Sequence, residues 1–484
     1  MTNTMTRREA RQGRITTPPT RQDTAPEAPE ESWDAFTQRG HRPKRSGLKA
    51  RLGFYKTNVE GAPSTTRQVE ILNTNVIASP ADDMGLLVGR DTLSRAPIAH
   101  DPAVAYQNGI INSTNTVVVG DVGSAKSSLL KTLFAARALI LEGRRVVVFD
   151  KKPETRDGEE RQGEYGPLAT KYGVKPIRLQ IGQGGSCINI LDKNIYGEGG
   201  GEAAQYRLLL TAAELAQNGK PLDQWEGEAL RVAHRHAVRQ AGIENRDILL
   251  ADVIDDLGLV RNVDYPHVSD AARERMHQAG LGIKYVLNRL RSAELGGLFD
   301  GPTSADIQLN AKLTVFDFSD LPEEGPAIPL AMMVANAWLM GVIAGDPGKV
   351  THLIVEEGWH LAGGPAGKVM RSNQKLQRAL GLVIATAFHH LSDIPEDDPA
   401  IAMIKEAETL FLYRQGRRSD AELCERLLNL RPGAAHTLMN LPKGTHLLKI
   451  GRRPEVRVQH VRSRFEIDVT NTDSALAGTS RKAG

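Results

Sequence analysis

The segment of residues 116–128, TVVVGDVGSAKSS, constrains the fold of this chain more than any other stretch. Its β-branched start favours a buried strand, its glycines favour a tight turn, and the apolar periodicity that follows predicts a helix. A strand, a glycine-rich turn and a helix form a phosphate-binding loop when a Lys-Ser pair opens the helix. The usual pattern has glycine directly before that lysine, whereas this chain has Ala125 before Lys126.

This loop predicts a nucleotide site built mainly from backbone N–H groups. Its glycines allow these groups to turn inward on an anion, and the start of the helix adds the positive end of its dipole. Lys126 is expected to reach the β- and γ-phosphates of ATP, and the Ser127 hydroxyl to ligate Mg²⁺. An ordinary strand-to-helix turn with the same residue types is the alternative. The predicted site comprises Gly120, Asp121, Val122, Gly123, Ser124, Ala125, Lys126, Ser127 and Ser128.

Ala125 can affect this loop in two ways. If its position needs a positive φ, alanine costs about 1–2 kcal/mol, which the loop can tolerate. If the phosphate passes directly over the Cα atom, the methyl group would block binding.

A second motif lies downstream, where an apolar strand ends in two carboxylates. Residues 352–359, HLIVEEGW, have the layout of a Walker B motif. Glu356 is expected to hold Mg²⁺ through water, and Glu357 to act as the general base that polarises the attacking water. Glu356 stands where aspartate is usual, so its carboxylate lies one methylene further from the backbone. Two solvated acids at a strand end would give the same pattern.

Two further strand ends carry polar residues that could act on the γ-phosphate. His389 follows a predicted strand and is a candidate sensor of that phosphate, the alternative being a histidine that caps the next helix or packs beneath it. Arg414 ends another predicted strand and is a candidate arginine finger for the site of a neighbouring subunit. A surface salt bridge is the alternative for Arg414.

The order of elements predicts an α/β fold with a central, mostly parallel sheet flanked by helices. A helix is expected over residues 127–142, and a charged helical insertion over about 202–295. The segment Ala327–Gly345 approaches membrane-spanning length, but its place between two strands of one sheet predicts a buried helix. The predicted strands cover residues 68–77, 85–88, 117–119, 145–149, 313–316, 352–355, 382–385, 409–413, 446–450 and 456–461.

Composition adds the domain organisation. The net charge of +3 gives no global argument for nucleic acid binding. Cys187 and Cys424 provide neither a disulfide framework nor a zinc spacing, which fits a reducing cytoplasm. The predicted parts are a disordered basic and Pro-rich tail (1–60), a short β lead-in (61–115), the first half of an ATPase core (116–200), the helical insertion (201–300), the second half of the core (301–465) and a flexible tail (466–484).

These motifs, in this order, resemble the conjugative-transfer ATPases of type IV secretion systems, especially their actinobacterial ATP-binding branch. The resemblance covers about residues 65–465 and implies a RecA-type P-loop motor that binds ATP and Mg²⁺ and assembles as a hexamer with ATP sites between subunits. This chain departs from the family pattern at Ala125, at Glu356 and in a charged insert over 153–162. Further similar stretches are 89–91, 98–102, 143–152, 163–168, 189–192, 389–393, 413–415, 441–444 and 458–460.

The resemblance implies a cytoplasmic ATPase that powers conjugative transfer of DNA or protein, with partners at the inner face of the membrane. A DNA translocase of the FtsK/HerA kind is the nearest alternative, because the basic N-terminal residues and the arginines of the 451–453 turn could then contact phosphates. A nucleotide-binding scaffold that does not hydrolyse ATP is the other alternative, and Ala125 and Glu356 are the residues that favour it.

Overall fold

The structure is a computed structural model of the 484-residue chain. It describes residues 84–154, 162–182, 184–195, 201–261, 264–310, 312–358, 366–367, 379–395 and 398–470, together with Leu48. The predicted strand over 68–77 lies outside the described residues. So do the predicted N-terminal tail, apart from Leu48, and the C-terminal tail beyond Thr470.

One sheet organises the described part of the chain, with its strands in the order β2-β1-β13-β12-β11-β3-β10-β9-β4-β8-β7. The strands from β11 to β7 pair in parallel, and β12, β13, β1 and β2 extend the sheet in antiparallel pairing. This arrangement confirms the predicted α/β fold. The strands are β1 Leu86–Asp91, β2 Pro97–His100, β3 Thr116–Val119, β4 Arg144–Asp150, β7 Ile177–Arg178, β8 Leu313–Asp317, β9 Val350–Val355, β10 Leu382–Phe388, β11 Thr409–Leu412, β12 Thr445–Ile450 and β13 Val456–His460.

Strand order brings the predicted motifs together. Every residue of β3, β4, β8 and β10 is buried, as in parallel sheets that are covered on both faces. β3 and β4 are joined through the phosphate-binding loop and its helix, yet β10 and β9 lie between them in the sheet. The carboxyl ends of β10 and β9 therefore lie beside the loop that follows β3.

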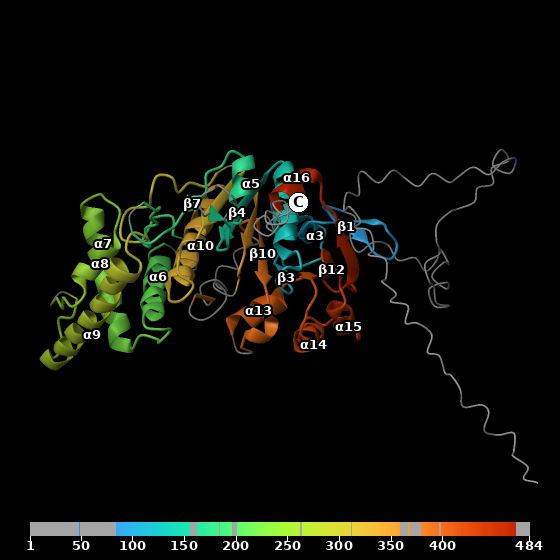
Figure 1. The fold of residues 1–484 in the computed structure, drawn as a ribbon. Helices are drawn as coiled ribbons and strands as arrows, with labels where there is room; N and C mark the ends of the chain where they lie inside the picture. Colours follow the sequence, from blue (N-terminus) through green and yellow to red (C-terminus); the bar gives the residue numbers. More distant parts are fainter. Residues whose placement is uncertain are drawn as a thin grey trace, which may run out of the picture.

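Helices cover the sheet and occupy most of the stretch that the sequence predicts as a helical insertion. The helix after the loop begins at Lys126 as α4 (Lys126–Leu129) and continues through the wider turns of η2 (Leu130–Arg137) and through η3 (Ala138–Ile140), close to the prediction. The helices α7, α8 and α9 gather at the end of the molecule farthest from β1 (Figure 1). The remaining elements are α3 Pro102–Gln107, β5 Pro153–Glu154, β6 Gln162–Gly163, α5 Gly166–Lys171, α6 Gly201–Ala216, α7 Gln224–Ile243, α8 Leu250–Asp256, α9 Asp270–Arg289, η4 Leu290–Glu294, α10 Ala327–Gly345, η5 Leu391–Asp393, α13 Pro399–Glu406, α14 Arg418–Leu427, α15 Ala434–Met439 and α16 Arg464–Thr470.

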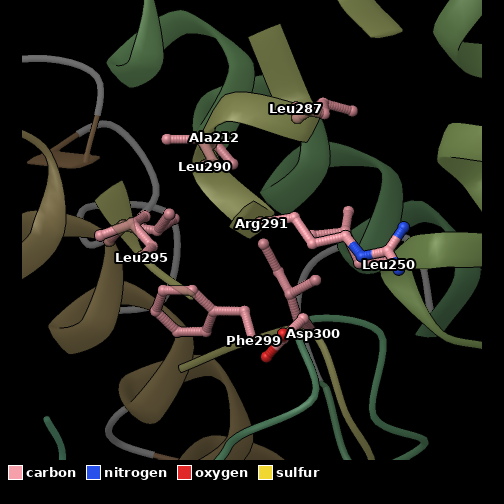
Figure 2. Close-up of a pocket in the computed structure, with 10 residues that line it drawn as sticks. Ala212, Leu250, Leu287, Leu290, Arg291, Leu295, Phe299 and Asp300 are labelled. Atoms are coloured by element: carbon pink, nitrogen blue, oxygen red, sulfur yellow. The ribbon is translucent and has the colours of Figure 1, made fainter. Parts of the chain in front are cut away.

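The helices of the insertion share an apolar core with the sheet. One cluster of buried residues includes Leu230 of α7, Leu287 of α9 and Phe316 of β8. Figure 2 shows the side chains of Leu287, Leu290 and Phe299 around a cavity of about 10 Å³ near α9. Such a cavity holds at most about one water molecule, so this region is closely packed.

The helix α10 covers one face of the sheet as a buried helix. By length and composition alone it could cross a membrane, but 78% of its most apolar stretch is buried inside the protein. At Gly341, an added Cβ atom would lie 1.7 Å from the backbone oxygen of Asn194, so the chain passes too close for any side chain. These contacts agree with the predicted core helix.

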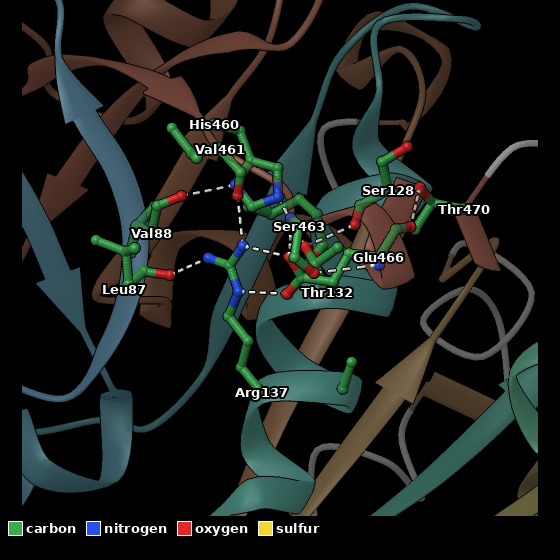
Figure 3. A network of polar contacts seen from close by, with 12 residues as sticks. Leu87, Val88, Ser128, Thr132, Arg137, His460, Val461, Ser463, Glu466 and Thr470 are labelled. Carbon is green, nitrogen blue, oxygen red and sulfur yellow. Dashed lines mark hydrogen bonds and ion pairs between the residues drawn. The ribbon is translucent and has the colours of Figure 1, made fainter. Parts of the chain in front are cut away.

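A polar network joins the helix after the loop to β1, β13 and α16 (Figure 3). Arg137 donates from Nε and Nη2 to the two carboxylate oxygens of Glu466, at 2.6 and 3.0 Å, and also to two backbone carbonyls. The Nδ1 atom of His460 lies 2.7 Å from the carbonyl oxygen of Val88, and its Nε2 atom lies 2.7 Å from the Thr132 hydroxyl. Because a carbonyl only accepts, Nδ1 carries the proton of the neutral ring. The network fixes the helix that begins at the loop.

Two buried histidines predict a loss of stability in acid. Burial lowers the pKa of His460 to about 3 and that of His352 to about 4. In the unfolded chain histidine titrates near pH 6.5, so the unfolded state binds more protons and stability falls as the pH drops below that value. Each histidine should contribute about 2 kcal/mol of the loss between pH 7 and pH 5, measured by urea unfolding. Since glutamine does not titrate, His460→Gln should lose about 2 kcal/mol less over this interval. An unchanged pH dependence in that variant would contradict the assignment.

Candidate nucleotide site

The phosphate-binding loop is held tightly against β11. A Cβ atom added at Gly120 would lie 2.5 Å from the Cβ of Tyr413 and 3.1 Å from the Ser124 hydroxyl oxygen, so only glycine fits there. Gly123 has a φ of 76° and faces open space, since an added Cβ would meet nothing within 4 Å. Beside Gly123, the loop therefore has room for a bound phosphate.

Ala125 occupies a left-handed backbone conformation, with φ 83° and ψ 24°. Of the two alternatives for Ala125, the backbone thus shows the first, in which this position needs a positive φ. Its partly buried side chain packs against the apolar cluster that includes Leu129 and Leu130. The methyl group is therefore in contact with the core, and backbone strain of about 1–2 kcal/mol is the remaining cost.

Replacing Ala125 with glycine is expected to stabilise the protein and to leave its nucleotide affinity unchanged. Relief of the strain exceeds the added entropy of the unfolded chain, for a net gain of about 0.5–1 kcal/mol in the free energy of unfolding. Gly123→Ala is the matched control, because it adds a methyl group in open space at a positive φ and should destabilise by a similar amount. Urea unfolding of both variants measures stability, and nucleotide titration of Ala125→Gly measures affinity. Tighter nucleotide binding by Ala125→Gly, by about tenfold, would show that the methyl group obstructs the phosphate.

Three predicted residues form one chain of polar contacts across the strand ends. The Nζ atom of Lys126 lies 3.0 Å from Nδ1 of His389, and Nε2 of His389 lies 3.0 Å from Oε1 of Glu357. An ammonium group only donates, so Nδ1 accepts from Lys126 and the Nε2–H group donates to the carboxylate. The structure thus brings together the loop after β3, the end of β10 and the end of β9.

Lys126 folds back onto its own loop. Its ammonium donates to the carbonyl oxygen of Gly120 and, at 2.9 Å, to that of Asp121. Burial lowers the pKa of Lys126 to about 8, and the positive charge of Lys152 adds to this effect. A phosphate that binds in the loop would offer this ammonium anionic acceptors in place of the two neutral carbonyls.

Glu357 lies in a strained turn at the end of β9. Its φ is 57°, a left-handed conformation that is uncommon for a residue with a side chain and costs backbone strain. The next residue, Gly358, donates its N–H to the carbonyl of Ala387 at 3.0 Å, and a Cβ there would lie 2.0 Å from a methyl carbon of Thr386. Close contact with β10 thus fixes this turn and holds Glu357 beside His389.

Glu356 and Ser127 present oxygen atoms to the same position. The Ser127 hydroxyl lies 3.4 Å from Oε2 of Glu356, and the Tyr165 hydroxyl donates to Oε1 at 2.9 Å. Burial raises the pKa of Glu356 above its usual range, and the nearby carboxylate of Glu164 raises it further. A bound cation would favour the ionised carboxylate.

This donor set fits Mg²⁺. A hydroxyl and a carboxylate are hard oxygen ligands, and Mg²⁺ in nucleotide sites takes only one or two protein ligands beside phosphate and water. Within the described residues there is no cluster of three or more histidine, cysteine or acidic side chains that could hold a metal alone. The candidate metal ligands therefore depend on a bound nucleotide to complete the coordination.

Arg414 is exposed and is separated from the end of β11 by Tyr413 alone. Its backbone carbonyl accepts a hydrogen bond from the N–H of Asp121 at 3.0 Å, which ties this strand end to the loop. In the described part of the chain, the Arg414 guanidinium makes no ion pair.

Several residues near the site were given no role by the sequence analysis. Tyr165 is fully buried and contacts Glu356, and Lys131 forms an ion pair of 3.1 Å with Glu164. The sequence signal for these residues is Lys131, a lysine among the apolar residues of the helix after the loop. A lysine that is buried there needs an acidic partner.

The fold was compared with known proteins. No protein-family model matches the sequence, and no curated protein matches it significantly. The structure of VirB4 of Thermoanaerobacter pseudethanolicus superposes with a TM-score of 0.65 at 19% sequence identity, covering 81% of this chain and 100% of that one. The bacterial conjugative coupling protein TrwBdeltaN70 superposes with a TM-score of 0.47 at 14% identity, covering 79% of this chain and 90% of that one.

The first superposition confirms the fold that the motifs predicted. It extends over most of this chain and over the whole of the compared VirB4 chain. At 19% identity it speaks for the fold alone. The chain therefore shares the fold of that VirB4 structure, with a large, mostly parallel sheet flanked by helices.

Proposed function

We propose that this protein is an Mg²⁺-dependent ATPase that acts as the motor of a conjugative transfer or type IV secretion system. The observation that carries the proposal is the contact chain Lys126–His389–Glu357, which joins a phosphate-binding lysine to a candidate base through a γ-phosphate sensor. An ordinary strand-to-helix turn does not require that these three side chains, which come from three separate parts of the chain, contact one another.

The residues would act in the following way. The N–H groups of the loop and the Lys126 ammonium would bind the β- and γ-phosphates. Ser127 and Glu356 would hold Mg²⁺, which supplies charge neutralisation on the phosphate oxygens. Glu357 would accept a proton from the attacking water, and His389 would hold the carboxylate in place through its Nε2–H group.

The assignment to conjugation or secretion rests on the order of the sequence motifs and on the shared fold with VirB4. In this assignment the protein is cytoplasmic or peripheral at the inner face of the membrane, and it works as a hexamer. Arg414, exposed at a strand end, would serve the ATP site of the next subunit. A solution mass that stays at one chain in the presence of Mg·ATP would leave Arg414 without a site to serve.

Phosphate release by the purified protein, with and without double-stranded DNA, separates the alternatives. The proposal predicts release that requires both ATP and Mg²⁺. Strong stimulation by DNA that disappears as salt rises from about 50 to 200 mM would favour the FtsK/HerA-type translocase, because phosphate contacts are salt-dependent. Nucleotide binding without phosphate release would leave only the scaffold.

A further inference from the structure

The two carboxylate oxygens of Glu356 face different partners. Oε1 accepts a hydrogen bond of 2.9 Å from the Tyr165 hydroxyl, and Oε2 lies 3.4 Å from the Ser127 hydroxyl. Both Glu356 and Tyr165 are buried, at 2% and 0% exposure. One oxygen is therefore engaged by the protein interior, and the other faces the candidate Mg²⁺ ligand of the phosphate-binding loop.

Tyr165 is itself held by groups from several elements. Its backbone N–H donates to Oδ2 of Asp150, at the end of β4, at 2.7 Å. The Lys131 ammonium lies 5.2 Å from the centre of its ring and pairs with the neighbouring Glu164 at 3.1 Å. A Cβ atom added at Gly163 would lie 2.3 Å from Oδ2 of Asp150, so the approach to Tyr165 is closely packed. The hydroxyl is thus a fixed point beside the carboxylate.

This fixed point matches the unusual residue at position 356. Glutamate has one more rotatable bond than the usual aspartate, so its carboxylate needs a further constraint to keep one orientation. An aspartate would be shorter by one C–C bond, about 1.5 Å, and could not reach the Tyr165 hydroxyl at hydrogen-bond distance without a shift of the backbone.

We propose that Tyr165 is a positioning residue for Glu356. The Tyr165 hydroxyl holds Oε1 of Glu356, so that Oε2 faces Ser127 and the Mg²⁺ of a bound nucleotide. This inference rests on the proposed function only in that the loop binds Mg·ATP. It does not require hydrolysis. Tyr165 touches neither nucleotide nor metal in this role and acts through Glu356 alone.

Tyr165→Phe tests the proposal through metal dependence of binding rather than through turnover. The affinity for a fluorescent ATP analogue is measured across a range of Mg²⁺ concentrations and again in EDTA. The Mg²⁺ concentration needed for half-maximal enhancement should rise about tenfold in Tyr165→Phe, since loss of an outer-shell partner weakens metal binding by about 10–100-fold. The affinity in EDTA should stay the same. Tyr172→Phe is the matched control, because that hydroxyl contacts the Ala136 carbonyl at 3.4 Å and not Glu356, and its Mg²⁺ requirement should not change.

A second variant makes the test independent of folding effects. In a Glu356→Asp background, Tyr165→Phe should have no further effect on the Mg²⁺ requirement, because the shorter side chain has no contact to lose. An equal Mg²⁺ requirement in wild type and Tyr165→Phe would overturn the proposal. A loss of nucleotide affinity by Tyr165→Phe in EDTA would also overturn it. So would a tenfold rise in the Mg²⁺ requirement caused by Tyr165→Phe in both the wild-type and the Glu356→Asp backgrounds. Wild-type binding that ignores Mg²⁺ would overturn both this proposal and the assignment of Glu356. Binding that needs Mg²⁺ without any hydrolysis would overturn only the motor.

Discussion

Lys126→Ala is expected to weaken ATP binding by about 100-fold, or roughly 3 kcal/mol. The ammonium is the one cation of the loop, and a charged hydrogen bond to phosphate in a buried site is stronger than the neutral contacts it replaces. Equilibrium titration with a fluorescent nucleotide measures the change. The fold should persist, because in the described structure this lysine donates only to its own loop and to His389.

Lys349→Ala is the control for Lys126→Ala. It removes the same charge from the opposite end of the sheet, before β9, where the lysine pairs with Asp346 at 3.1 Å. Its ATP affinity should equal that of wild type. Equal affinities in wild type and Lys126→Ala would show that the loop does not bind phosphate in the proposed manner.

Glu357→Gln is expected to reduce the rate of hydrolysis by about 10²–10⁴-fold while ATP affinity stays within about threefold. The amide oxygen of glutamine can still accept the hydrogen bond from His389, so the geometry of the contact chain persists. An amide cannot accept a proton from water, so the chemical step fails. Rapid-quench measurement of ATP cleavage, with binding measured in parallel, separates the two effects.

The control for Glu357→Gln is Glu422→Gln, which makes the same change on the exposed face of α14. There the carboxylate pairs only with Arg418 at 2.7 Å among described contacts. Hydrolysis should be unaffected. A large loss of ATP affinity in Glu357→Gln would mean that this carboxylate supports binding rather than chemistry.

The elements around the site were predictable because their signals are local. Each element was predicted from residues that are close together in the sequence. These are the run of valines in β3, the Lys-Ser pair at the start of α4 and the two acids after β9. Their order then resembled that of a known ATPase family, which implied that these parts belong to one nucleotide site. The structure brings Lys126, His389 and Glu357 into contact there, and their catalytic roles stay proposals.

Other features depend on contacts between distant residues and could not be predicted. The place of β10 and β9 between β3 and β4 is set by strand pairing, which no local pattern specifies. The sequence could not predict whether Ala125 adopts a positive φ or places its methyl group in the path of the phosphate, because the same residues are compatible with both. Tyr165 reaches Glu356 across 191 positions of the chain, and only the fold places its hydroxyl there.

Steady-state phosphate release by wild type and Glu357→Gln at saturating Mg·ATP tests the central claim most directly. The account predicts that wild type releases phosphate faster than the variant by about a hundredfold or more, with both proteins fully bound to nucleotide. Equally slow release by the two proteins would contradict it, because the residue assigned as the base would then contribute nothing to turnover.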